Sequence, residues 1–206
     1  MLEKQYNGPV CGLDEAGRGP LAGPVMAACV FIPAENRRKK FWHKVTDSKK
    51  LTAAQREALY PYIIEYSAYG IAAADVGEID RINILQASML AMKRAMQVMT
   101  TNFSIIPEAA LVDGNYPPKL DCPVQTVIRG DSASLSIAAA SILAKIARDR
   151  VMRELCQQFP HYGWSKNAGY GTAHHLEALR QYGPTIHHRT SFAPVQAALL
   201  LRSSGG

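Results

Sequence analysis

The sequence of 206 residues lacks any long hydrophobic run, since its longest uninterrupted apolar stretch is Val25 to Ile32. A membrane-spanning helix needs about 20 apolar residues, so no such span is expected. Residues 1–8 also lack the apolar core that a signal peptide carries. We therefore expect a cytoplasmic protein.

Cysteine is scarce as well, and no Cys-x-x-Cys pair occurs among Cys11, Cys29, Cys122 and Cys156. This spacing suggests neither a zinc knuckle nor a disulfide framework. Gly (15) and Pro (12) are close to average and 48% of residues are hydrophobic, which excludes collagen-like and disordered chains. The length favours one domain with an appendage. The formal net charge of +6 favours an anionic partner such as nucleic acid, although many other soluble proteins carry a similar charge.

The hydrophobic pattern predicts an α/β or α+β architecture with a mixed sheet. Short apolar runs rich in β-branched residues predict strands over 10–13, 23–32, 68–76, 109–112 and 124–128. Apolar spacing and capping signals predict helices over 84–99, 134–156, 172–181 and 194–201. A further helix should open at the capping box Thr52–Gln55, and Pro61 should kink or divide it. Residues 203–206 should fray.

Acidic residues follow three of the predicted strands: Asp14 and Glu15, then Asp113, then Asp131. Ligands of open α/β sheets bind beyond the carboxyl ends of the strands, so these acids can converge although they are far apart in sequence. Two like charges about 4 Å apart repel by on the order of 4 kcal/mol at an effective dielectric constant near 20. Oxygen ligands without His or Cys suit a hard cation, Mg²⁺ or Mn²⁺, and two such ions suit phosphodiester hydrolysis.

Each acid also has a plain structural interpretation. Asp113 precedes a glycine and would suit a hairpin turn, Asp131 would suit a helix N-cap, and Asp14 with Glu15 would suit a solvated turn. Adjacent strand residues also point to opposite faces of a sheet. Asp14 and Glu15 can therefore share a site only if the chain bends, which the segment Gly17–Pro20 would allow.

The segment Gly12–Pro20, Gly-Leu-Asp-Glu-Ala-Gly-Arg-Gly-Pro, resembles the N-terminal signature of the ribonuclease HII family. Further segments resemble that family in the family order: Asp47–Leu51, Leu111–Asn115, Gly130–Lys145, Gly169–Thr172 and Arg189–Phe192. The resemblance implies a ribonuclease H-like fold, in which helices flank a five-stranded mixed sheet and a helical C-terminal extension follows. It also implies a catalytic core, residues 1–157, and an extension, residues 158–206, packed on the core as one compact unit.

The resemblance implies an endonuclease that hydrolyses the RNA strand of RNA/DNA hybrids and cuts 5′ of single ribonucleotides embedded in duplex DNA. Cleavage would leave 5′-phosphate and 3′-hydroxyl ends, and the role would be ribonucleotide removal during DNA replication and repair. By motif position, the catalytic and metal-binding residues would be Asp14, Glu15, Asp113 and Asp131. Asp14 is the best candidate to bridge two Mg²⁺ or Mn²⁺ ions. We expect the protein to act as a monomer.

The same resemblance implies the substrate-binding residues. The segment Gly17-Arg18-Gly19 matches the one that senses the ribose 2′-hydroxyl, and Tyr170 matches the tyrosine that packs on the sugar at the RNA-to-DNA junction. Glycines let the backbone approach a ligand closely, and the 2′-hydroxyl distinguishes RNA from DNA. Lys49 would attract phosphates irrespective of base sequence. From position alone Tyr170 is equally a core or surface-loop aromatic residue, and Gly171 stands where many relatives carry proline.

Two other functions stay open at this stage. A non-catalytic module that binds hybrids would keep its function when Asp113 is replaced by Asn, whereas an enzyme would lose cleavage and keep binding. A nuclease or resolvase of the same fold that acts on DNA alone would cut equally well when deoxyribose replaces the single ribose. The pairs His174-His175 and His187-His188 lack a third nitrogen or sulfur ligand at useful spacing, so we expect surface or junction packing there.

Overall fold

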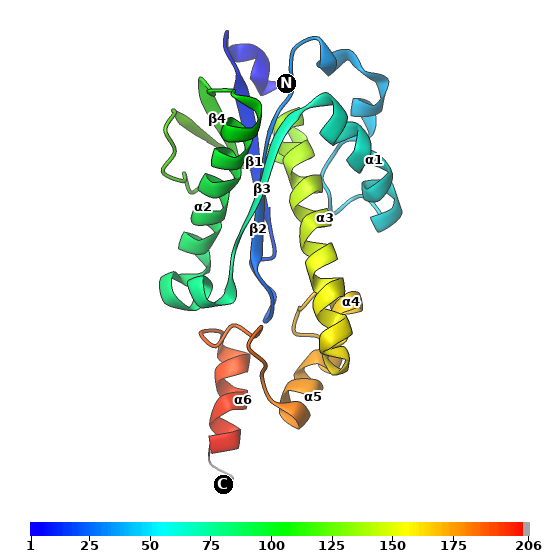
Figure 1. Ribbon diagram of the computed structural model, residues 1–206, viewed down its shortest axis with the longest axis vertical. Coiled ribbons are helices and arrows are strands. Elements are labelled where there is room, and N and C mark those ends of the chain that lie inside the picture. Colours follow the sequence, from blue (N-terminus) through cyan, green and yellow to red (C-terminus); the bar gives the residue numbers. More distant parts are fainter. Residues whose placement is uncertain (204–206) are drawn as a thin grey trace.

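The computed structural model describes residues 1–203, and helices flank both faces of its central sheet (Figure 1). The strands are β1 (Val10–Ala16), β2 (Val25–Phe31), β3 (Ala68–Ala74), β4 (Ala109–Asp113) and β5 (Val124–Val127). The helices are α1 (Ala53–Tyr66), α2 (Val76–Phe103), α3 (Leu135–Gln158), α4 (Trp164–Asn167), α5 (Ala173–Tyr182) and α6 (Ala193–Ser203). The expected fraying at the C-terminus falls, apart from Ser203, outside the described residues.

The sheet is mixed, as predicted, with the strand order β3-β2-β1-β4-β5. Strands β1, β2 and β3 pair in antiparallel fashion, whereas β4 runs parallel to both β1 and β5. The last pair between β1 and β4 is Leu13 with Val112. The carboxyl ends of β1, β4 and β5 therefore lie at the same edge of the sheet.

The two faces of the sheet carry separate hydrophobic cores. Helix α2 covers one face, where Met92 and Met99 pack against Leu13. Helices α1 and α3 cover the other face, to the right of the strands in Figure 1. Helix α3 approaches β1 closely, because a Cβ atom added to Gly12 would lie 2.3 Å from the backbone nitrogen of Ile137. The small residues in the first half of α3 permit this approach.

Two helices differ from the sequence prediction. Helix α2 begins at Val76 rather than at residue 84, because Asp75 and Glu78 form a capping box that the apolar spacing did not reveal. Asn83 then interrupts the helical backbone (φ 66°, ψ 164°), and its side chain accepts hydrogen bonds from the next turn, which explains why regular spacing starts at Ile84. Helix α1 runs through Pro61 as one element, so Pro61 does not divide it, and of the predicted kink or division the division is wrong.

The C-terminal helices form a third core beneath the sheet. Trp164, Leu179 and Val195 pack there against Leu21 and Met152, so this region contacts both the loop after β1 and the end of α3. Helices α5 and α6 lie beyond the end of the sheet in Figure 1. Within residues 1–203 no helix is long and apolar enough to cross a membrane.

Candidate active site

The four candidate acids come from three elements at the parallel edge of the sheet. Asp14 and Glu15 lie within β1, just past its last pair with β4. Asp113 ends β4, and its Oδ1 accepts a hydrogen bond from the backbone N–H of Gly130 (2.7 Å). Asp131 belongs to the 3-10 helix Gly130–Ser132 that precedes α3. The hydrogen bond at Gly130 thus ties the end of β4 to the segment that carries Asp131.

The expected bend between Asp14 and Glu15 is absent. Strand β1 does not end at Leu13 but pairs regularly with β2 as far as Ala16, opposite Met26. Its extension places Asp14 and Glu15 on opposite faces of one strand. Asp14 lies on the same face as Gly12, which α3 covers. Both Asp14 and Glu15 lie past the last pair with β4, so their side chains can approach this end of the sheet from its two faces without a bend.

Electrostatic coupling connects these acids nevertheless. Burial raises the pKa of Asp14 well above its usual value, and the negative charges of Glu15 and Asp113 raise it further. The pKa of Glu15 is also raised, chiefly by burial, with Arg18 opposing and Asp113 adding to the shift. Burial raises the pKa of Asp131, and the charges of Asp47 and Asp113 add to it. The charge of Asp113 thus acts on Asp14, Glu15 and Asp131.

The plain structural interpretations of these acids are wrong. Strands β4 and β5 are parallel, so Asp113 is not in a hairpin turn. Ser134, rather than Asp131, caps helix α3 through its side chain. Asp14 is only 8% exposed and lies in a strand, so it is not a solvated turn residue. Partly buried acids at a sheet edge that do not form a turn or cap a helix are candidates for catalysis or metal binding.

The donor set fits a divalent metal ion by its chemistry. It contains carboxylate oxygens alone, which Mg²⁺ and Mn²⁺ prefer. Within residues 1–203 no three His, Cys, Asp or Glu side chains already stand around a common ion position. Mutual repulsion contributes to the raised pKa values of Asp14 and Glu15. A bound cation would remove this repulsion.

The segment Asp47–Leu51 also reaches this site. Ser141 Oγ donates a hydrogen bond to Ser48 Oγ (2.6 Å), and the Ser141 hydroxyl opposes the rise in the pKa of Asp14. The negative charge of Asp47 raises the pKa of Asp131. Lys49 is exposed on the same segment. The sequence analysis took from this segment the family resemblance and Lys49, but not Asp47, whose charge acts on Asp131.

The candidate ribose-binding residues come together. Gly17 has φ of +98°, and an added Cβ would meet the Arg148 side chain, so glycine is required there. A Cβ added to Gly19 would lie 3.4 Å from Cε1 of Tyr170, which places the tyrosine ring beside this loop. Tyr170 is 50% exposed and is therefore not a core residue. Arg18 reaches back to Glu15, with 3.4 Å between its Nη1 and the carboxylate oxygen.

The histidine pairs split between two environments. His175 and His188 are buried with their Nε2 atoms 3.1 Å apart, whereas His174 is exposed. His175 Nδ1 donates to the carbonyl of Tyr170, so its Nε2 accepts hydrogen bonds from Trp164 and His188. His188 Nδ1 accepts from the backbone N–H of Thr185. Both imidazoles are neutral in this network, which is the expected junction packing and not a metal site.

We expect this histidine network to make the protein sensitive to acid. Burial, followed by repulsion from His175, lowers the pKa of His188 to about 3, whereas the unfolded chain binds a proton below pH about 6.5. The free energy of unfolding should therefore fall from pH 6.5 to 5, by up to about 1.4 kcal/mol per pH unit for this group. Urea unfolding at several pH values tests this. The variant His188→Gln should lose distinctly less stability over that interval, and an equal loss would contradict the network.

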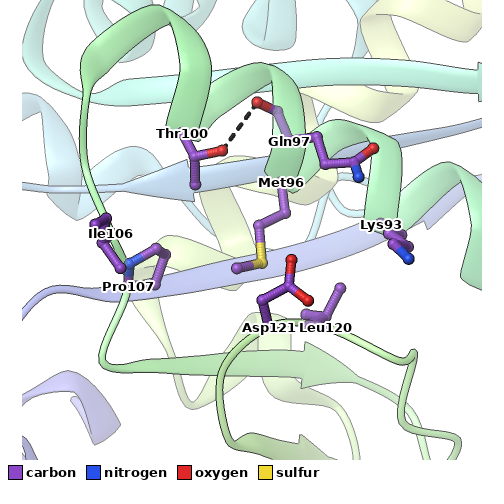
Figure 2. A pocket seen from close by; sticks show the side chains of 8 residues that line it. All are labelled: Lys93, Met96, Gln97, Thr100, Ile106, Pro107, Leu120 and Asp121. Atoms are coloured by element: carbon purple, nitrogen blue, oxygen red, sulfur yellow. Dashed lines mark hydrogen bonds between the residues drawn. The ribbon is translucent and has the colours of Figure 1, made fainter.

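A small pocket lies away from these residues (Figure 2). It has a volume of about 210 Å³ between α2 and the loops that precede β4 and β5, with Met96, Ile106 and Leu120 among its lining residues. Thr100 Oγ1 donates a hydrogen bond to the Gln97 carbonyl at its rim (2.9 Å). None of the candidate acids or ribose-binding residues lines it, so it is not part of this site.

The fold, together with the candidate acids at the parallel edge of the sheet, defines the class of protein, a ribonuclease H-type nuclease. The chain is similar to the crystal structure of ribonuclease H2 from Pyrococcus horikoshii, with a TM-score of 0.73 and 26% identity over 96% of this chain and 100% of that one. It also shares its fold with a Bst ribonuclease HIII crystallised in complex with Mn²⁺, with a TM-score of 0.80 and 19% identity over 98% of this chain and 72% of the other.

The family follows from the sequence comparisons. The family model described as Ribonuclease HII matches residues 11–195. A ribonuclease HII from Paramagnetospirillum magneticum is 51% identical over 199 residues, which cover 97% of each chain. The chain belongs to the ribonuclease HII family. Its membership confirms the predicted enzyme class, a metal-dependent ribonuclease that cleaves the RNA of RNA/DNA hybrids.

Proposed function

We propose that this ribonuclease also cuts 5′ of single ribonucleotides embedded in duplex DNA and leaves 5′-phosphate and 3′-hydroxyl ends. Its role would be ribonucleotide removal during DNA replication and repair. The observation that carries this proposal is the contact between Gly19 and Tyr170. One exposed aromatic ring beside one glycine loop makes a surface for a single sugar, so recognition needs no long RNA strand.

Asp14, Glu15, Asp113 and Asp131 are proposed as the catalytic residues and as ligands of two Mg²⁺ or Mn²⁺ ions. Such ions, when bound, activate a water molecule and stabilise the leaving oxygen. Asp14 is nearly buried and the charges of both Glu15 and Asp113 raise its pKa, which suits a ligand shared by two ions. Asp113 is held by the Gly130 N–H, so one of its oxygens has a fixed direction.

Two groups are proposed to bring the duplex to these acids. The exposed Lys49 stands on the segment that Ser48 anchors to α3, and its charge attracts the phosphate backbone irrespective of base sequence. Gly17-Arg18-Gly19 and Tyr170 then select the ribose. The core, residues 1–157, would supply the acids, and the extension, residues 158–206, would supply Tyr170. We propose that both act within one monomeric, cytoplasmic protein.

Cleavage of a labelled DNA duplex that contains one ribonucleotide tests this function. With Mg²⁺ or Mn²⁺ we expect a single cut on the 5′ side of the ribonucleotide, with 5′-phosphate and 3′-hydroxyl ends. The matched duplex with deoxyribose at that position should stay intact. Equal cutting of both would favour a DNA nuclease of the same fold, and an intact ribonucleotide duplex beside a cleaved RNA/DNA hybrid would restrict the enzyme to hybrids.

A further inference from the structure

Three segments far apart in sequence form one backbone network behind the candidate ribose site. Leu21 N–H donates to the Gly169 carbonyl, and Arg189 N–H donates to the Leu21 carbonyl, both at 2.8 Å. Gly23 N–H donates to the carbonyl of His187, also at 2.8 Å. The loop after β1 is therefore clamped between the Tyr170 segment and the segment that precedes α6.

Arg189 adds a side-chain clamp to this network. Its side chain is fully buried, and its guanidinium donates to the carbonyl oxygens of Gly17 (2.6 Å), Arg18 (2.8 Å) and Gly23 (3.0 Å). Burial, reinforced by the nearby charge of Arg148, lowers the pKa of Arg189 to about 9. Burying a charge costs free energy, and the hydrogen bonds to these three carbonyls offset part of that cost.

The direction of these carbonyls sets the direction of the neighbouring amides. Every peptide bond here is trans, so the N–H that follows each carbonyl points the opposite way. The carbonyls of Gly17 and Arg18 face inward to Arg189, and the N–H groups of Arg18 and Gly19 therefore face away from it. No hydrogen bond from either amide is found within residues 1–203. Gly19 is also the residue beside the Tyr170 ring.

We propose that Arg189 is a positioning residue for ribose selection: it fixes the two peptide planes that present the Arg18 and Gly19 amides to the 2′-hydroxyl. This inference rests on the proposed function. Arg189 does not touch the substrate, because loop residues cover it. It acts through the loop, whose conformation is set before the nucleic acid binds.

A second buried arginine shows that the assignment is specific to Arg189. Arg148 donates to the carbonyls of Ala22, Pro24 and Ala168, which lie at the base of the loop and before Tyr170. It makes no hydrogen bond to the carbonyls of Gly17 or Arg18. Arg148 thus stabilises the base of the loop and the backbone before Tyr170. Among residues 1–203, Arg189 alone orients the two peptide planes through side-chain hydrogen bonds.

The test measures ribose discrimination in binding. In the Asp113→Asn background, which should not cleave, the Kd for the single-ribonucleotide duplex and for the all-DNA duplex are measured with Mg²⁺ present. We expect the parent to prefer the ribonucleotide by about tenfold, the effect of one or two hydrogen bonds. Adding Arg189→Lys should bring the ratio of the Kd for the all-DNA duplex to the Kd for the single-ribonucleotide duplex to about 1. The lysine ammonium cannot replace the planar set of N–H donors of the guanidinium. The Kd for the all-DNA duplex should change by less than about threefold.

Arg56→Lys is the matched control. Arg56 is also buried, and it donates to the carbonyls of Ser48 and Leu51, outside the ribose site. Its replacement should cost stability and weaken both duplexes alike, with the ratio retained. A preserved ratio in Arg189→Lys would overturn the assignment and leave the proposed function intact. A parent that does not discriminate would overturn both.

If Arg189→Lys does not fold, the unmodified chain provides the test. Persistent hydrogen bonds to the Gly17 and Arg18 carbonyls should slow solvent exchange of the Arg189 Nη–H protons by on the order of a hundredfold relative to those of Arg180, which is exposed at the surface. Arginine-selective NMR of the free protein measures both rates. Equal rates would show that the loop is not held in advance and would overturn the proposal.

Discussion

Replacing Asp113 by Asn should lower the rate of RNA cleavage by on the order of 10²–10³-fold, the loss typical when one electrostatic group of an active site is removed. Asn has nearly the same shape, and its side-chain oxygen can still accept the Gly130 N–H. It cannot supply the negative charge that a metal ion needs. Single-turnover cleavage of an RNA/DNA hybrid measures the rate, and the Kd for the hybrid should stay within about threefold.

Asp121→Asn is the control for this prediction. Asp121 belongs to the loop that precedes β5 and lines the pocket of Figure 2, which contains none of the candidate acids. Its replacement removes the same charge from the protein and should leave cleavage unchanged. If the Asp113 and Asp121 variants cleave alike, the acid edge of the sheet is not the active site.

Adding Mg²⁺ or Mn²⁺ to the metal-free protein should raise its Tm by about 5–10 °C at a metal concentration of 100 times Kd. Binding to the folded state alone contributes about 2.7 kcal/mol at that concentration. Each kcal/mol shifts Tm by about 2–4 °C in a chain of this size. The physical source of the effect is neutralisation of the carboxylates, whose burial and mutual repulsion raise the pKa values of Asp14 and Glu15.

For Asp14→Asn we expect a higher Tm than the wild type in chelator and a smaller rise in Tm when metal is added. This variant removes a buried charge, so in chelator it should melt above the wild type. It should also lose most of the metal-induced rise in Tm. Differential scanning fluorimetry of both proteins with EDTA and with metal gives the comparison. An unchanged wild-type Tm at saturating metal, together with no gain in the variant, would show that the acids do not form one cation site.

Local sequence signals predicted the sheet and most helices because each element carries its own hydrophobic period or cap. The length of β1 was not predictable from its apolar run, because the pairing of Asp14 and Glu15 with β2 is a long-range contact. The first part of α2 was missed because its apolar residues are few and its start depends on the capping box at Asp75. The local hydrophobic pattern thus predicts the presence of a helix or strand better than it predicts the residues at which that element begins and ends.

The candidate acids could be proposed from sequence because each follows an apolar run. Their alternative interpretations could not be dismissed, since only the parallel pairing of β4 with β5 shows that Asp113 is not in a hairpin. Arg189 belonged to a recognised segment, yet its role depends on the carbonyls of Gly17 and Arg18, more than 170 residues away in sequence. Every residue has a backbone carbonyl, so the sequence does not indicate which carbonyls accept hydrogen bonds from Arg189.

The most direct test of the central claim is a substrate in which sulfur replaces one non-bridging oxygen of the phosphate that the enzyme cuts. Sulfur is a softer ligand, which Mg²⁺ binds poorly and Mn²⁺ tolerates better. If the acids hold a metal ion against this phosphate, one sulfur diastereomer should be cut slowly in Mg²⁺, and Mn²⁺ should restore its rate in the wild type but not in Asp113→Asn. Equal slowing of both diastereomers in both metals would contradict the account.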